Sequence, residues 1–224
     1  AGKTETAKLV MNFLVESSSR ACGSNEEADA KSAELAEKLL LANKVLEAFG
    51  NAKTSRNNNS SRFGKWTEIV FDANGQIVGG KVVQYLLEKT RVCGQAKGER
   101  NYHIFYQLLA NADTYPELKL KEAKDYHYLN QSGVTTIENV DDKENFEELL
   151  DAMSKLGFEE KHLVAIRRVL AGLLLLGNLD IVVEEKANEE NGSKITNMDV
   201  LEEAAALMEI DADGLHKTLL TKQL

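Results

Sequence analysis

The sequence predicts an α/β fold that is mostly helical. Apolar residues recur at three- and four-residue spacing in several long segments, which is the period of a helix. One stretch alternates in the manner of a strand and returns through the turn Ala73-Asn74-Gly75. Pro116 is the only proline among 224 residues, so proline seldom interrupts the helices.

The helices follow one another through most of the chain. Helical spacing predicts them directly after Gly2-Lys3-Thr4 and at residues 31–49, 101–109, 146–156, 163–176, 199–208 and 211–220. The segment 163–176 is apolar almost all round, so we expect it to be buried. Thr196 precedes Asp199 by three residues, which is a capping-box pattern, and Asp211 is a candidate helix cap. The segments 17–29 and 51–61 are rich in polar turn residues and are predicted to be loops.

One hairpin is the only sheet that the pattern predicts. Residues 66–71 form its first strand and residues 76–87 hold the returning strand. Arg91-Val92-Cys93 is a candidate for a further short strand.

Composition excludes several classes of function. Lys and Arg number 27 against 36 Asp and Glu, which gives a net charge of −9 and argues against a general nucleic-acid binder. Cys22 and Cys93 are too few for a disulfide framework and are predicted to be free thiols, and no His/Cys pair has zinc-ligand spacing. Arg167 and Arg168 interrupt the longest apolar run, so no membrane span is predicted.

The first residues carry a phosphate-binding pattern. Gly2-Lys3-Thr4 matches the end of G-x-x-x-x-G-K-[ST], in which the lysine reaches the β- and γ-phosphates and the hydroxyl ligates Mg²⁺. The helix that follows offers free N–H groups to an anion. An ordinary helix start is the alternative, because so short a pattern is common by chance. The chain opens without Met and in the middle of this motif, so we expect a piece of a longer protein.

A second polar motif covers residues 57–65. It supplies amides from three asparagines, hydroxyls from Ser60 and Ser61, and the cationic fork of Arg62. This set suits a loop that closes on a triphosphate and its metal ion. A solvated turn before a strand is the alternative, and the position of the motif 53 residues after Thr4 (57 minus 4) favours the phosphate interpretation.

These motifs and several others resemble those of a myosin motor domain. The resemblance runs through most of the chain, on segments 1–5, 46–54, 57–65, 85–89, 98–109, 128–133 and 170–178. Kinesins share Asn-x-x-Ser-Ser-Arg but continue with Ser-His, whereas this chain continues with Phe63-Gly64. Leu175 departs from the histidine often found in the family, which indicates a change in packing.

The resemblance implies a P-loop NTPase-type fold with part of the central sheet. Residues 1–110 would be the nucleotide-binding part, with the end of the P-loop and switch I, and residues 111–224 the helical upper actin-binding subdomain. The cofactors would be ATP and Mg²⁺. The implied sites are cofactor binding by Gly2, Lys3, Thr4, Asn51 and Asn57, metal ligation by Thr4 and Ser61, and catalysis by Ser60, Ser61 and Arg62. Ser60 would lie beside the γ-phosphate and the attacking water, and Arg62 would pair with a glutamate of switch II.

The implied function is part of an actin-based motor that couples Mg-ATP hydrolysis to force. The expected partner is the actin filament, and light chains or calmodulin would bind only through a neck downstream of this chain. The expected location is the cytoplasm, on the cytoskeleton. Neither the first half of the P-loop nor switch II lies within the sequence, so we expect Arg62 to lack its partner and the isolated chain to turn over ATP poorly. A non-motor nucleotide-binding or actin-tethering module is the alternative, and another P-loop enzyme is a distant third.

Overall fold

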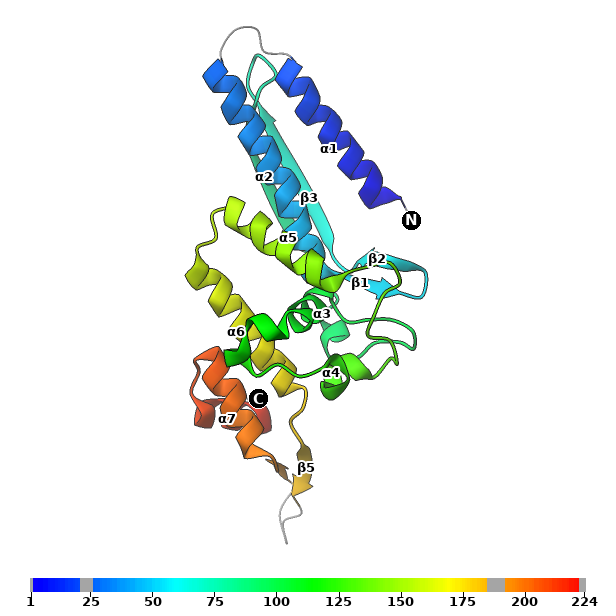
Figure 1. The fold of residues 1–224 in the computed structure, drawn as a ribbon, viewed down its shortest axis with the longest axis vertical. Coiled ribbons are helices and arrows are strands. Elements are labelled where there is room, and N and C mark those ends of the chain that lie inside the picture. The colour runs from blue at the N-terminus through cyan, green and yellow to red at the C-terminus, as the bar shows by residue number, and fades with distance from the viewer. Residues whose placement is uncertain (1, 21–25, 185–191, 222–224) are drawn as a thin grey trace. The chain divides into compact units, whose positions relative to one another are not determined.

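The computed structural model describes residues 2–20, 26–184 and 192–221, which form two compact units (Figure 1). The first unit contains residues 1–88 and 147–158, and the second contains residues 89–146 and 159–224. No helix in the described ranges is long and apolar enough to cross a membrane. Cys93 is a free, exposed thiol, as predicted, whereas Cys22 lies outside the described residues.

The first unit begins with two long helices. Its elements are α1 (Lys3–Arg20), α2 (Glu26–Gly50), β1 (Asn51–Thr54), β2 (Asn57–Ser61), β3 (Gly64–Phe71) and β4 (Ile77–Tyr85). The predicted helices after Gly2 and at 31–49 are confirmed. The loop predicted for 17–29 is wrong at both ends, because α1 continues to Arg20 and α2 already begins at Glu26. A long-range contact supports the end of α1: the buried Ser18 hydroxyl accepts a hydrogen bond from the N–H of Ile77 at 2.9 Å.

The predicted hairpin is confirmed as β3 and β4. They pair antiparallel from Gly64↔Tyr85 to Phe71↔Ile77. The carboxylate of Asp72 closes the turn by accepting the N–H groups of Asn74 at 2.9 Å and Gln76 at 2.8 Å. Helix α2 packs against β4, where a Cβ on Gly80 would lie only 2.6 Å from Leu39 Cδ2. Glycine at position 80 therefore allows the helix to approach the hairpin.

Two further hairpins were not predicted. β1 pairs with β2, and β5 (Ile181–Glu184) pairs with β6 (Gly192–Ile195), both antiparallel. The prediction of a loop over 51–61 is therefore wrong for most of that segment, because ladder hydrogen bonds come from the backbone and polar side chains do not prevent them. Within the described ranges all three sheets are two-stranded. The mixture of helix and strand agrees with the predicted α/β class at that coarse level.

The second unit is mostly helical. Its elements are η1 (Lys89–Val92), α3 (His103–Ala110), η2 (Ala112–Thr114), η3 (Pro116–Leu118), η4 (Ala123–Asp125), α4 (His127–Asn130), the start of α5 (Asp142–Lys155), α6 (Glu160–Leu176), β5, β6, α7 (Met198–Met208) and α8 (Ala212–Leu220). The helices predicted at 101–109, 146–156, 163–176, 199–208 and 211–220 are confirmed with shifted ends.

Helix α6 packs against α7, and small residues permit the close approach. A Cβ on Gly172 would lie 2.6 Å from Met208 Cγ. Leu170 and Leu174 are buried, but Val169 remains 43% exposed, so α6 is buried along one face and not all round as expected.

A buried ion-pair network organises the start of the second unit. Arg100 is fully buried and pairs with both carboxylate oxygens of Asp142, at 2.8 and 3.0 Å. Its guanidinium also lies 3.8 Å from the ring centroid of Tyr106. Arg91 donates to Glu99 at 2.9 Å and to the carbonyl of Arg100 at 3.1 Å. These bonds explain why residues 89–92 form a 3₁₀ turn and not the candidate strand: the turn carries Arg91 into the network.

Two predicted helix caps have different outcomes. The capping box of Thr196 and Asp199 is wrong, because Asn197 occupies the N-cap of α7, with no side-chain bond to the first turn, and the Thr196 hydroxyl donates to Asp180 at 2.5 Å. Asp211 does cap α8, since its carboxylate accepts the N–H of Gly214 at 2.6 Å.

Candidate nucleotide-phosphate site

The start of α1 has the backbone expected of the glycine motif. Gly2 has φ +94°, a conformation that side-chain-bearing residues rarely adopt, and its carbonyl accepts the N–H of Thr6 at 2.8 Å. The first N–H groups of a helix have no partner within the helix and attract anions. The backbone of Lys3 and Thr4 lies in this first turn, whereas their side chains lie outside the described part of the structure. Their predicted contacts therefore stay predictions.

The β1–β2 hairpin positions most of the second motif. Its register pairs Asn51 with Ser61, Ala52 with Ser60 and Thr54 with Asn57. Asn57 therefore lies at the turn end of the hairpin, whereas Ser60 and Ser61 lie at the other end, beside Asn51.

Asn57 is exposed and its side chain braces the turn. Its Oδ1 accepts the N–H of Asn59 at 2.8 Å, and its own N–H donates to the hydroxyl of Thr54 at 3.2 Å. The Nδ2 group of Asn57 is a donor of the kind that a phosphate oxygen accepts. The predicted role of Asn57 therefore requires a phosphate near the turn end of β2.

Asn51 is buried and belongs to a chain of side-chain amides. It is 2% exposed, and its Nδ2 donates to Oδ1 of Asn59 at 2.9 Å. Asn59 in turn donates to Oε2 of Glu47 at 3.2 Å. The Oδ1 atom of Asn51 is buried and has no hydrogen-bond partner among the described residues. A buried acceptor without a partner is costly, so this atom is suited to a donor from outside the described residues.

Arg62 follows β2 directly and links two groups of the site. Its Nε donates to Oε2 of Glu88 at 2.7 Å, and its Nη1 donates to the hydroxyl of Ser60 at 3.1 Å. Glu88 is therefore a carboxylate partner of Arg62 within the chain, different from the switch II glutamate that the resemblance implies. Sequence reasoning missed Glu88, although it lies in the Tyr85–Lys89 motif, because its pairing spans 26 positions.

Ser61 fits the role of a magnesium ligand. It is exposed at the end of β2, and its hydroxyl proton is donated to the carbonyl of Phe63 at 2.8 Å. Its oxygen lone pairs are thereby left for a cation, and Mg²⁺ prefers hard oxygen donors completed by phosphate and water. No cluster of three or more His, Cys, Asp or Glu side chains in the described ranges could hold a metal ion.

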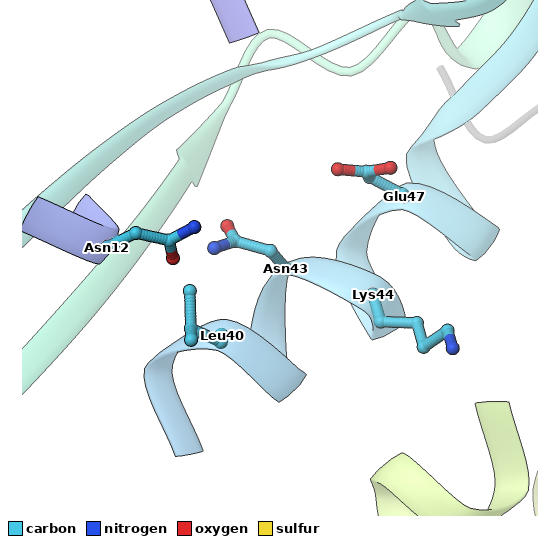
Figure 2. A pocket seen from close by; sticks show the side chains of 5 residues that line it. All are labelled: Asn12, Leu40, Asn43, Lys44 and Glu47. Atoms are coloured by element: carbon cyan, nitrogen blue, oxygen red, sulfur yellow. The ribbon is translucent and has the colours of Figure 1, made fainter. Parts of the chain in front are cut away.

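Two pockets adjoin the β1–β2 hairpin within the first unit. A pocket of about 810 Å³ is lined by residues of α1, α2 and the strands β1–β4, and its lining includes the predicted site residues Asn51 and Ser61. A smaller pocket of about 350 Å³ lies between α1 and α2 (Figure 2). There the amides of Asn12 and Asn43 point toward each other, and Asn43 also accepts a hydrogen bond from Lys65 Nζ at 2.5 Å.

A helix start preceded by a glycine of positive φ is an arrangement that proteins use to bind phosphate groups. A sequence profile described as Myosin head (motor domain) matches residues 1–224. The chain belongs to this family.

Related proteins support the assignment. The chain is 44% identical to unconventional myosin-Ia of Rattus norvegicus over 227 residues, which covers 100% of this chain and 26% of that protein. It is 42% identical to the Myosin-I heavy chain of Dictyostelium discoideum, covering 98% of this chain and 9% of the relative. It is 44% identical to unconventional myosin-Ib of Mus musculus, covering 94% of this chain and 18% of that protein. The chain thus spans about a quarter of these relatives' length or less.

Proposed function

We propose that this chain is the switch I part of an actin-based myosin motor that couples Mg-ATP hydrolysis to force. The observation that carries the proposal is the hairpin that places Asn51, Ser60, Ser61 and Arg62 together, in a chain of the myosin head family. Phosphoryl transfer requires mainly positioning and charge stabilisation, and a hairpin with bonded side chains supplies the positioning. Residues 1–110 would form the nucleotide-binding part of a P-loop NTPase, and residues 111–224 the upper actin-binding subdomain.

The residues would share the phosphate chemistry. Gly2 and Lys3 would hold the β- and γ-phosphates, and Thr4 and Ser61 would hold Mg²⁺. Asn57 would donate to a phosphate oxygen, and Asn51 would accept from a donor group of the nucleotide through its unpaired Oδ1. Bound Mg²⁺ would neutralise charge on the phosphate oxygens.

Ser60 is prepared to donate a hydrogen bond. Its oxygen already accepts a hydrogen bond from Arg62 Nη1 at 3.1 Å. A hydroxyl group has one proton and two lone pairs, so this bond leaves its proton available. Ser60 would therefore donate to a γ-phosphate oxygen or to the attacking water, and Arg62 would fix its direction.

The non-motor module remains the second candidate. It is favoured only if the switch II of the longer protein lacks its glycine or glutamate, because Arg62 would then lack the second carboxylate that the family uses. The actin filament as partner, light chains or calmodulin on a downstream neck, and a cytoplasmic, cytoskeletal location belong to the motor proposal.

A lysine substitution tests the proposal. In the complete motor domain that carries this chain, Lys3→Ala should abolish steady-state ATP turnover, because the β/γ-phosphate contact is lost. Lys31 is exposed on helix α2, so Lys31→Ala is the matched control and should turn over ATP normally. Near-normal turnover of Lys3→Ala would contradict the nucleotide-binding role.

A further inference from the structure

We infer that Glu88 is a positioning residue that fixes Arg62 and, through Arg62, directs the Ser60 hydroxyl. The inference rests on the proposed function, because Ser60 matters only if it faces a phosphate. Glu88 lies 26 positions after Arg62, outside the polar motif of residues 57–65.

Side-chain contacts join the three residues in series. Glu88 Oε2 accepts from Arg62 Nε at 2.7 Å, and Arg62 Nη1 donates to Ser60 Oγ at 3.1 Å. The carboxylate holds the guanidinium at Nε, and the same planar group reaches Ser60 through Nη1, so the two contacts together orient the fork. The two side chains of the ion pair are 28% and 33% exposed, so water only partly competes with the pair.

Backbone bonds hold both ends of the pair. The N–H of Arg62 donates to the carbonyl of Gly50 at 2.8 Å, at the junction of α2 and β1. The N–H of Glu88 donates to the carbonyl of Arg62 at 2.9 Å. Glu88 is thus tethered to Arg62 through its main chain as well as its carboxylate, which is a geometry for positioning and not a chance surface contact.

An unusual turn delivers Glu88 to this place. Leu86 has φ +57°, which is uncommon for a residue with a side chain, and that side chain is 87% exposed. Packing of Leu86 therefore does not account for its conformation. The turn lies between the end of β4 and Glu88, and strained backbone of this kind concentrates at functional sites.

One carboxylate does not saturate the guanidinium. Arginine has five N–H donors, and the bonds to Glu88 and Ser60 use two of them. Glu88 is therefore compatible with a second carboxylate on Arg62, and its role is to orient the fork.

Steady-state kinetics of the complete motor domain test the inference. Glu88→Gln should lower kcat for Mg-ATP about tenfold and change KM less than about twofold, because orientation and not binding is lost. Glu88→Asp keeps the charge and should recover part of kcat. Glu148→Gln is the matched control, since it breaks the Lys44–Glu148 ion pair elsewhere in the first unit and should leave kcat unchanged.

A double mutant tests whether Glu88 acts through Arg62. The variant with Arg62→Gln and Glu88→Gln should be no slower than Arg62→Gln alone, because residues that act in series are not additive. Additive losses, or a Glu88→Asp variant as slow as Glu88→Gln, would overturn the inference.

A chemical readout separates this inference from the proposed function. Phenylglyoxal modifies accessible arginines, and mass spectrometry follows the peptide that contains Arg62. Glu88→Gln should raise the modification rate of Arg62 several-fold, and Glu148→Gln should not change it. A motor domain without ATP turnover that still shows this increase would refute the proposed function and not the pairing, whereas an unchanged rate would refute the pairing itself.

Discussion

Two arginine–carboxylate pairs in this chain have the same chemistry but different roles, one structural and one at the candidate phosphate site. Arg100 and Asp142 in the second unit are 0% and 14% exposed, and their bidentate contact is part of a buried network. Arg62 and Glu88 in the first unit are 28% and 33% exposed and share one contact, while the second branch of the arginine reaches a serine. Burial and the bidentate contact make the first pair a structural element, whereas partial exposure leaves the second pair able to serve a ligand.

Breaking the buried pair should have the largest effect on stability. Arg100→Met leaves the Asp142 carboxylate without its bidentate partner, which typically costs about 3–5 kcal/mol. Chemical denaturation of the motor domain should show this loss in the free energy of unfolding. A loss below about 1 kcal/mol, within the range of exposed pairs, would remove the distinction between the two arginines.

Breaking the exposed pair should affect activity far more than stability. Arg62→Gln should cost no more than about 1 kcal/mol of folding free energy, because the pair is partly solvated. Its ATP turnover should fall by about a hundredfold or more, since it no longer directs Ser60 or stabilises charge at the phosphates. The free energy of unfolding and the ATP turnover should both be measured on one preparation of this variant. If Arg62→Gln lowered the free energy of unfolding by as much as Arg100→Met and left ATP turnover unchanged, Arg62 would be a structural residue like Arg100.

A helix cap in the second unit should have the smallest effect. Asp211→Ala removes the bond to the N–H of Gly214 and should lower the free energy of unfolding by about 1 kcal/mol, without changing ATP turnover. Thermal melting together with an ATPase assay checks both expectations. Asp211→Asn, which keeps an acceptor at the cap, should retain most of the stability.

Local signals made part of the fold predictable. The β3–β4 hairpin follows from alternation and the Asn74-Gly75 turn, and the helices follow from apolar spacing. The β1–β2 hairpin lacked such a signal, because Asn57 to Ser61 are polar and their pairing comes from backbone bonds with β1. The turn at Arg91 accompanies side-chain contacts with Glu99 and Arg100, eight and nine positions further on, which apolar periodicity does not reveal.

The candidate site shows the same limit. The prediction of its residues rests on two motifs, which supply the glycine, lysine, hydroxyl and arginine groups that suit phosphate binding. The connections between them were not predictable. Glu88 pairs with Arg62 across 26 positions. The buried Asn51 donates a hydrogen bond to Asn59, which in turn donates to Glu47 near the end of α2.

The most direct test of the nucleotide-phosphate site is a Mg²⁺ titration of ATP turnover by the complete motor domain with Ser61→Ala. Ser61 is exposed and its hydroxyl oxygen is available to a cation, so its loss should weaken metal binding with little effect on folding. We predict that the Mg²⁺ concentration for half-maximal turnover rises at least about tenfold, which corresponds to about 1.4 kcal/mol of lost binding free energy. A titration curve that matches the unsubstituted protein would contradict the assignment of this hairpin to the Mg-ATP site.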